Sequence, residues 1–416
     1  MILPCRVQWT CNRHRADSLP LALLLAACLL APLGEMMGQE AVTAASEAAG
    51  VGWLPAVPLQ ITAGVDMGYD DHVNGGTAST TSSGQKSLFA TENLVLVYSR
   101  PSQHTQVSLV GVASFTQYVD IGTDDKMGNV TLSLTHNFST RLSFYASVYA
   151  TYATEPDFKS DVGPENVRAP HFDTADIFSV TYQWLPRLST VTSYTFHNVK
   201  YADSSIGGSQ DRIDGTIGET LKFSLTSRTN LLGDYRFEKI DYDTAPMNST
   251  THSILAGIDH HLTEHLVFSV LGGNSFRSQE NSGDSTSPTF QSSLAYARSN
   301  HSLTWTGSYG FEAPNVAGVS SRQTFRTGVA LAYNLTSRLS SITGVYYHHD
   351  DNQGSASSGS SSAGTQDSLD LLLGFTYRVN NRLALHANYS HTSQSSLGQT
   401  SGYSQNRCSA GLTYTY

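Results

Sequence analysis

The sequence is poor in charged side chains, in cysteine and in long apolar runs. Charged residues make up 14% of the 416 residues, against roughly 25% in typical soluble chains. Hydrophobic residues reach only 39%, and no segment beyond the N-terminal region approaches the roughly 18 consecutive apolar residues of a membrane helix. The low charge argues against a series of ordinary soluble domains. The lack of a long apolar run argues against a helical membrane protein.

Cysteine is too scarce to build a disulfide framework. Cys5, Cys11 and Cys28 lie in a region that we expect to be removed, which leaves Cys408 alone in the mature chain. We interpret Cys408 as a small apolar residue on a lipid-facing strand. The chain also has no excess of positive charge, because its formal net charge is -10. We therefore expect no nucleic-acid partner.

Ser, Thr, Gly and Asn are abundant instead, and Tyr, with 21 copies, is the main aromatic residue. This composition is typical of strands with one face toward lipid and the other toward water. The C-terminal stretch shows the pattern, because Cys408, Ala410, Leu412, Tyr414 and Tyr416 alternate with polar or small residues. An apolar strand at the end of the chain is expected where the last strand pairs with the first and closes a barrel.

Residues 1–44 have the features of a secretory signal peptide. Arg6, Arg13 and Arg15 precede an apolar run of fifteen residues, Leu19–Leu33, and small residues follow. A lipoprotein cleavage site ending at Cys28 is an alternative, although apolar residues rather than a polar tether come after it. Residues 45–58 form a short periplasmic lead, too small for a plug domain. We expect a transmembrane β-barrel over residues 59–416.

A tight-turn pattern recurs along this barrel region: an apolar residue, two polar residues, a basic residue and usually Leu. Phe138–Leu142 and Leu335–Leu339 are clear copies. The basic positions of successive turns, with looser copies included, are 141, 187, 228, 265, 301, 338 and 382. A regular period of this kind indicates a repetitive architecture. A propeller blade has a similar period but needs four short strands, whereas each period here holds two long ones, so a barrel is favoured.

The repeat predicts 18 antiparallel strands in a closed up-and-down barrel. Short turns and both termini should lie at the periplasmic end, and long loops at the other end. The expected strands are 59–69, 88–99, 103–118, 128–138, 141–153, 174–185, 187–200, 211–225, 228–242, 250–262, 265–278, 288–299, 301–313, 321–335, 338–350, 367–379, 382–394 and 404–416.

Side chains on the polar parity of these strands should face a water-filled lumen. They carry both signs of charge. The candidate pore-lining residues are Arg236, Arg277, Arg326 and Arg378, with Asp66, Asp234, Glu238, Asp259 and Asp370. Glu219 departs from the pattern, because it shares the apolar parity of Ile217 and Leu221. Either a β-bulge near Gly218 or a position above the membrane would remove this conflict.

Two further features bear on function. His348, His349, Asp350 and Asp351 form the densest cluster of titratable residues, which we interpret as a solvated loop edge rather than a metal or acid/base site. No Ser, His and carboxylate set is brought together by the repeat, so we expect neither an enzyme nor a bound cofactor or metal.

The Pro-containing loop 157–173 is the candidate to fold inward and constrict the pore, and the loop 354–364 should be an exposed segment.

The chain resembles Gram-negative outer-membrane β-barrels through its alternating C-terminal strand. Its Leu-Thr-Ser-Arg-Leu turns and Tyr-rich last strand are similar to those of the type 2 β-barrel porins. The resemblance implies an outer-membrane location, passive passage of small hydrophilic solutes, contact with lipid, and binding of the barrel-assembly machinery to Tyr403–Tyr416. It allows a homo-oligomer. The alternative function is a non-conducting structural or surface-display barrel, or one accessory to surface-polysaccharide export.

Overall fold

A computed structural model describes residues 59–73, 85–122, 124–154, 169–280, 283–314, 319–354, 364–395 and 402–416. The expected signal peptide and periplasmic lead lie outside these residues. So do most of the loop 157–173 and of the loop 354–364.

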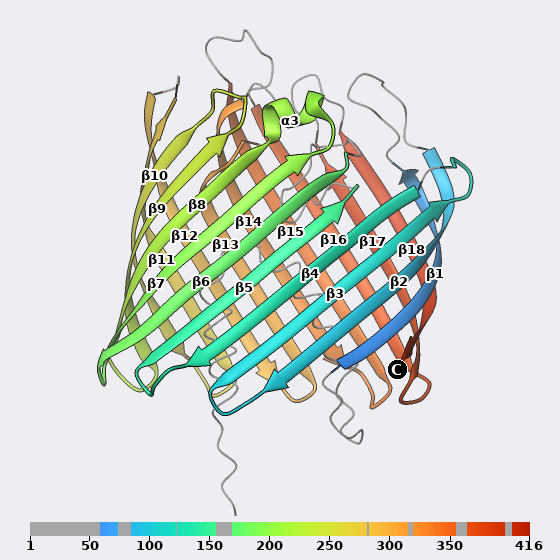
Figure 1. Ribbon diagram of the computed structural model, residues 1–416, viewed down its shortest axis with the longest axis horizontal. Helices are drawn as coiled ribbons and strands as arrows, with labels where there is room; N and C mark the ends of the chain where they lie inside the picture. The colour runs from blue at the N-terminus through green and yellow to red at the C-terminus, as the bar shows by residue number, and fades with distance from the viewer. Residues whose placement is uncertain are drawn as a thin grey trace, which may run out of the picture.

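The described chain folds into one sheet of 18 antiparallel strands that closes on itself (Figure 1). The strands are β1 (Leu59–Val73), β2 (Gln85–Pro101), β3 (Thr105–Tyr118), β4 (Asp124–Asn137), β5 (Leu142–Ala153), β6 (His171–Leu185), β7 (Leu188–Tyr201), β8 (Arg212–Ser224), β9 (Thr229–Tyr242), β10 (Ser249–His261), β11 (Leu266–Gln279), β12 (Gly283–Arg298), β13 (His301–Glu312), β14 (Val319–Asn334), β15 (Leu339–Gly354), β16 (Gly364–Arg378), β17 (Leu383–Gln394) and β18 (Tyr403–Thr415). The predicted fold class, strand number and strand order are confirmed.

The barrel closes by pairing of β1 with β18. Their register joins Val65 to Leu412 and Tyr69 to Cys408, so apolar residues face apolar residues across the seam. The backbone N–H of Tyr416 donates to the Ile61 carbonyl at 2.8 Å. Closure leaves no unpaired strand edge, which an apolar environment would penalise.

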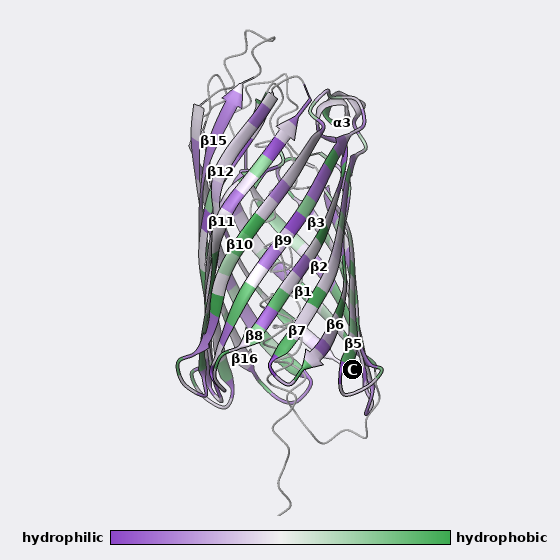
Figure 2. Ribbon diagram, turned by 90° about the vertical axis from the view of Figure 1, so that its left-hand side faces the viewer, coloured by the Kyte–Doolittle hydropathy of each residue, from purple (hydrophilic) through white to green (hydrophobic). Residues whose placement is uncertain are grey.

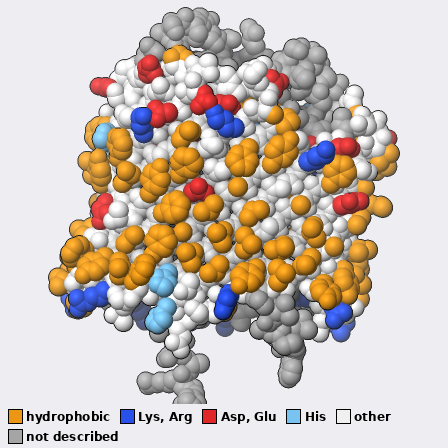
Figure 3. Space-filling model, viewed as in Figure 1, with side chains coloured by type: hydrophobic (Ala, Val, Ile, Leu, Met, Phe, Trp, Pro, Cys, Tyr) orange, Lys and Arg blue, Asp and Glu red, His pale blue; other side chains and the backbone are white. Residues whose placement is uncertain are grey.

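The two faces of the wall are inverted relative to a soluble protein. Apolar residues on the outer face are exposed, such as Met67 at 69%, whereas polar residues on the inner face are buried, such as Asp66 at 7%. Figure 2 shows hydrophilic and hydrophobic residues interspersed along each strand. Figure 3 shows a broad band of apolar side chains across the outer surface. An apolar band outside and polar groups inside are the arrangement of a transmembrane barrel.

The repeated turn motif has a local physical cause. In the β14–β15 turn, Thr336 Oγ1 accepts hydrogen bonds from the N–H groups of Arg338 (3.2 Å) and Leu339 (3.0 Å). Asn380 Oδ1 does the same for Arg382 (2.8 Å) and Leu383 (2.9 Å) in the β16–β17 turn. A Ser, Thr or Asn at this position thus accepts hydrogen bonds from backbone N–H groups of the turn that do not pair with a neighbouring strand.

One short helix, α3 (Ser204–Gln210), lies at the long-loop end between β7 and β8. Asp203 caps it by accepting from the Ser205 N–H at 2.9 Å. Hydrogen bonds from Ser205 hold the pKa of the Asp203 carboxyl below its ordinary value. Ile206 packs against the buried Val199 and Tyr201. Among the described residues, no helix is long and apolar enough to cross a bilayer.

Glu219 lies on the outer face without a β-bulge, since the pairing of β8 with β7 and β9 is continuous through it. It is five residues from the short-turn end of β8 at Ser224, so it also lies within the apolar band. Both expected explanations are therefore wrong. Thr192 Oγ1 donates to the Glu219 carboxylate at 2.6 Å, which supplies one neutral partner on the same outer face.

The cluster at 348–351 is not a solvated loop edge, because β15 continues to Gly354. His348 (5% exposed) and Asp350 (0%) are buried on the inner face. His349 lies on the opposite face, where its Nδ1 is 2.8 Å from Asp367. The strand expected from the sequence ended too early, at residue 350.

Candidate functional site

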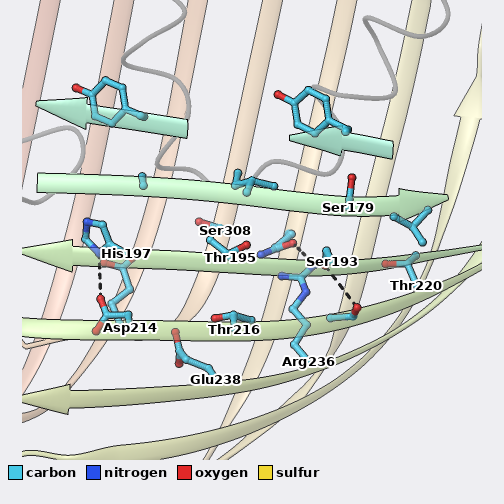
Figure 4. Close-up of a pocket in the computed structure, with 18 of the residues that line it drawn as sticks. Ser179, Ser193, Thr195, His197, Asp214, Thr216, Thr220, Arg236, Glu238 and Ser308 are labelled. Carbon is cyan, nitrogen blue, oxygen red and sulfur yellow. Dashed lines mark hydrogen bonds and ion pairs between the residues drawn. The ribbon is translucent and has the colours of Figure 1, made fainter. Parts of the chain in front are cut away.

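The barrel encloses a cavity of about 1370 Å³. It is lined by strands from β2 to β14, together with Arg407 of β18. Hydroxyls are the commonest polar groups of the lining, and Figure 4 shows Ser179, Ser193, Thr195, Thr216 and Thr220 on adjacent strands of the same wall. Alternate residues of each strand face the same side, so a run of Ser and Thr at every second position produces this hydroxyl-lined surface.

One ionic cluster of the cavity wall is centred on His197. Its Nε2 is 2.6 Å from Asp173 on β6, and its Nδ1 is 3.0 Å from Asp214 on β8 (Figure 4). Arg212 Nε donates to the same Asp214 at 3.2 Å. Because the imidazole lies between two carboxylates, both of its nitrogens have a partner and the ring is held against the wall.

Two other charge pairs lie on the same wall. Arg236 Nε is 2.6 Å from Asp234, and its guanidinium also donates to Gln291 at 3.0 Å. Lys222 Nζ is 3.4 Å from Asp259, which also accepts from Ser269 at 2.6 Å. Each positive side chain thus has a carboxylate beside it.

The most deeply buried charges form a second cluster near the long-loop end. The Arg277 side chain is fully buried and donates to Thr251 Oγ1 (2.9 Å) and to Glu238 Oε2 (3.3 Å). Glu312 accepts from Arg326 through both carboxylate oxygens, at 2.7 and 2.6 Å. Arg322 donates to Glu312 at 3.0 Å. A bidentate Arg–carboxylate pair fixes the orientation of both side chains.

The nine predicted site residues fall into two groups. Asp234, Arg236, Glu238 and Asp259 line the cavity, whereas Asp66, Arg277, Arg326, Asp370 and Arg378 do not. Asp66 is bonded to His386 (2.5 Å) and Asn93 (2.7 Å), and Asp370 accepts from Thr392 at 2.6 Å. The structure therefore brings four of the nine together around one space and places the other five elsewhere.

Sequence reasoning missed six charged residues of these clusters. They are Asp173, His197, Arg212, Asp214, Glu312 and Arg322. The parity of β6–β8 would have found the first four. Glu312 and Arg322 lie at strand ends next to a loop, where alternation gives little guidance. Among the described residues, no group of three or more His, Cys, Asp or Glu side chains is placed to hold a metal ion.

A closed antiparallel barrel with an apolar exterior and a polar interior is an outer-membrane β-barrel of a Gram-negative bacterium. The family model described as "Putative beta-barrel porin 2" matches residues 62–416. The chain belongs to this family, as the turns and the last strand indicated.

No curated protein matches the chain. Solved structures with a similar arrangement include OccAB4 of Acinetobacter baumannii, with 10% identity and a TM-score of 0.40 over 86% of this chain and 99% of that one. OpdQ of Pseudomonas aeruginosa has 9% identity and a TM-score of 0.42 over 86% and 97% of the two chains. The siderophore receptor PirA of Pseudomonas aeruginosa has 8% identity and a TM-score of 0.42 over 88% and 81%.

Proposed function

We propose that the protein is a porin-like channel through which small hydrophilic solutes diffuse passively. The observation that carries the proposal is the cavity of about 1370 Å³ inside a closed barrel, lined by hydroxyl groups and charge pairs. Hydroxyls can replace part of the hydration shell of a polar solute without holding it by charge. The proposal includes no catalytic step.

Charge pairing in the lumen implies weak ion selectivity. Arg236 is compensated by Asp234 and Lys222 by Asp259. Glu312 is compensated by Arg322 and Arg326. A solute in the lumen therefore meets pairs of opposite charges. A ring of charges of one sign would instead repel ions of that sign.

The second candidate is a non-conducting structural or surface-display barrel, or a barrel accessory to surface-polysaccharide export. One observation favours it: part of the interior is occupied by buried side chains, among them Arg277, Gln366 and Asp350. If these groups block every path along the axis, the barrel would not conduct.

Single-channel recording separates the two. Purified protein is added to a planar lipid bilayer, and we expect stepwise increases of current with an ohmic voltage dependence. A heat-denatured sample is the control for detergent leakage. Repeated insertion of folded barrel without current steps would contradict the channel and support the structural role.

We further propose that residues 1–44 are a cleaved signal peptide and 45–58 a periplasmic lead to the barrel of residues 59–416. We also propose that the barrel-assembly machinery binds Tyr403–Tyr416. The intact mass of the protein purified from outer membranes tests the cleavage. A mass equal to that of the full 416 residues would contradict it.

A further inference from the structure

The long-loop end of β13 separates from β12, whereas β14 stays paired with β15 as far as Val319–Gly354. The β12–β13 pairing stops at Phe290–Tyr309, although β12 continues to pair with β11 up to Gly283. The last residues of β13 remain paired with β14, as in Glu312–Arg322. Pro288 contributes to the separation, since it has no N–H to donate to a ladder.

Burial shows which way these ends turn. Val319, Ser320, Ser321 and Arg322 are 0, 9, 4 and 2% exposed. In a wall strand every second residue faces outward, as in β1, where exposed and buried residues alternate. Four consecutive buried residues require protein on both sides of the strand. The segment made of Gly310–Pro314 and Val319–Arg322, here named the inner hairpin, is therefore displaced inward relative to β12, while its β14 half stays paired with β15.

Side chains of the nearby strands β9 and β11 hold the inner hairpin through its main-chain carbonyls. Tyr242 Oη of β9 donates to Pro314 O at 3.0 Å. On β11, Arg277 donates to Glu312 O at 2.9 Å, and Gln279 donates to Ser320 O. All three contacts pass over β12, which separates β11 from β13 in the sheet. These contacts require the ends of β13 and β14 to lie inward of β12.

Arg277 connects the inner hairpin to three strands at once. Besides Glu312 O, it bonds Thr251 on β10 and Glu238 on β9, and its guanidinium carbon lies 4.7 Å from the centre of the Phe311 ring. The planar fork of an Arg side chain can serve several acceptors in fixed directions, which the ammonium group of Lys does not. Its complete burial means that none of this bonding is shared with bulk water.

We propose that the inner hairpin is the constriction of the channel and that Arg277 is the positioning residue that holds it on the luminal side of β12. This inference rests on the proposed function. It assigns pore size to the inner hairpin and its anchor, rather than to the loop 157–173 that was the candidate from the sequence. Since Glu312 and Arg322 belong to the inner hairpin and are paired with each other, the narrow zone should select solutes by size more than by charge.

The test measures pore size with neutral polymers in planar bilayers. The largest polyethylene glycol that still lowers the single-channel current is determined for wild type and for Arg277→Ala and Arg277→Lys. Both variants should admit larger polymers, with conductance increased about twofold because conductance follows pore area. Arg298→Ala is the control, because Arg298 is an exposed arginine at the short-turn end of β12, outside the cavity lining and the inner hairpin. Its polymer cut-off should equal that of wild type.

A disulfide tests the position of the inner hairpin independently of current. In a Cys408→Ser background, Gln279→Cys with Ser320→Cys should form a disulfide in folded protein and should cancel the effect of Arg277→Ala. An unchanged cut-off in a folded, conducting Arg277→Ala variant, or failure of the disulfide to form, would overturn the constriction. Failure of wild type to conduct while the disulfide forms would overturn the channel function but not the position of the inner hairpin.

Discussion

Single side chains explain the features of this sequence that repeat. The basic residue of each turn marks the period, but the Ser, Thr or Asn two positions before it makes the hydrogen bonds. Ser139 Oγ accepts from Arg141 and Leu142, both at 3.1 Å, as Thr336 does for Arg338 and Leu339. The motif therefore persists because the turn needs an acceptor at that position.

The turn acceptor can be tested at Thr336. Thr336→Val keeps the shape of the side chain but removes the acceptor for two N–H groups, so the free energy of unfolding should fall by about 1 kcal/mol. Ser337→Ala in the same turn is the control, with a change within about 0.5 kcal/mol. Urea unfolding of the barrel in lipid vesicles, followed by Trp fluorescence, measures both. Equal effects of the two changes would count against the turn mechanism.

Glu219 gives a second prediction for a single residue. A carboxylate on the lipid face costs free energy, by less than the roughly 2–4 kcal/mol of a basic residue at the membrane midplane. Glu219→Leu should therefore stabilise the barrel by about 1–2 kcal/mol, even though it loses the Thr192 hydrogen bond. Glu264→Leu, in the β10–β11 turn, should leave stability nearly unchanged. A loss of stability in Glu219→Leu would show that the Thr192 hydrogen bond outweighs the cost of the carboxylate on the lipid face.

At the scale of whole strands, β10 and β11 pack closely at two glycines, Gly257 and Gly273. A Cβ atom added to Gly273 would overlap Ile254 O, and one added to Gly257 would overlap Val270 O. A Cβ atom added to Gly272, which precedes Gly273 on β11, would have no neighbouring atom within 4 Å. Gly273 thus permits a backbone contact that any larger residue would force apart.

The matched pair Gly273→Ala and Gly272→Ala tests this approach. Gly273→Ala should lower the free energy of unfolding by about 1–3 kcal/mol, the usual cost of overpacking. Gly272→Ala should change it by less than about 0.5 kcal/mol. The same vesicle-based urea titration measures both variants. If Gly273→Ala is as stable as wild type, β10 and β11 must be further apart than described.

The strands also show how far sequence reasoning reached. All 18 strands were predicted in order. The predicted ends differ from the observed ends by a few residues, mostly at the long-loop side. There, β1 and β15 each extend four residues further than predicted, to Val73 and Gly354. Strands at that end continue above the apolar band, where alternation no longer has to match lipid. The extension adds Asp351–Gly354 to β15, so His348 and Asp350 lie within the strand and are buried rather than at its solvated edge.

Seen as a whole, the molecule has a lumen in which charges of opposite sign lie side by side. Wild-type protein should therefore show a permeability ratio of K⁺ to Cl⁻ close to one. Arg236→Ala removes the cation 2.6 Å from Asp234, so the ratio should rise at least about twofold in favour of K⁺. The reversal potential across a salt gradient measures the ratio, and Arg298→Ala, at the exposed short-turn end of β12, is the control. An unchanged ratio in Arg236→Ala would mean that permeating ions do not pass this wall.

The sequence by itself determined the closed barrel, the strand order and the inner and outer faces. It could do so because a strand with lipid on one side and water on the other must alternate at every second residue, and each turn must satisfy its own backbone. Only the tertiary structure decided which charges meet. Arg277 contacts Glu238, Thr251 and Glu312 from three other strands, and the inner hairpin separates from β12. These arrangements depend on barrel curvature and on contacts between distant strands, and alternation along one strand records neither.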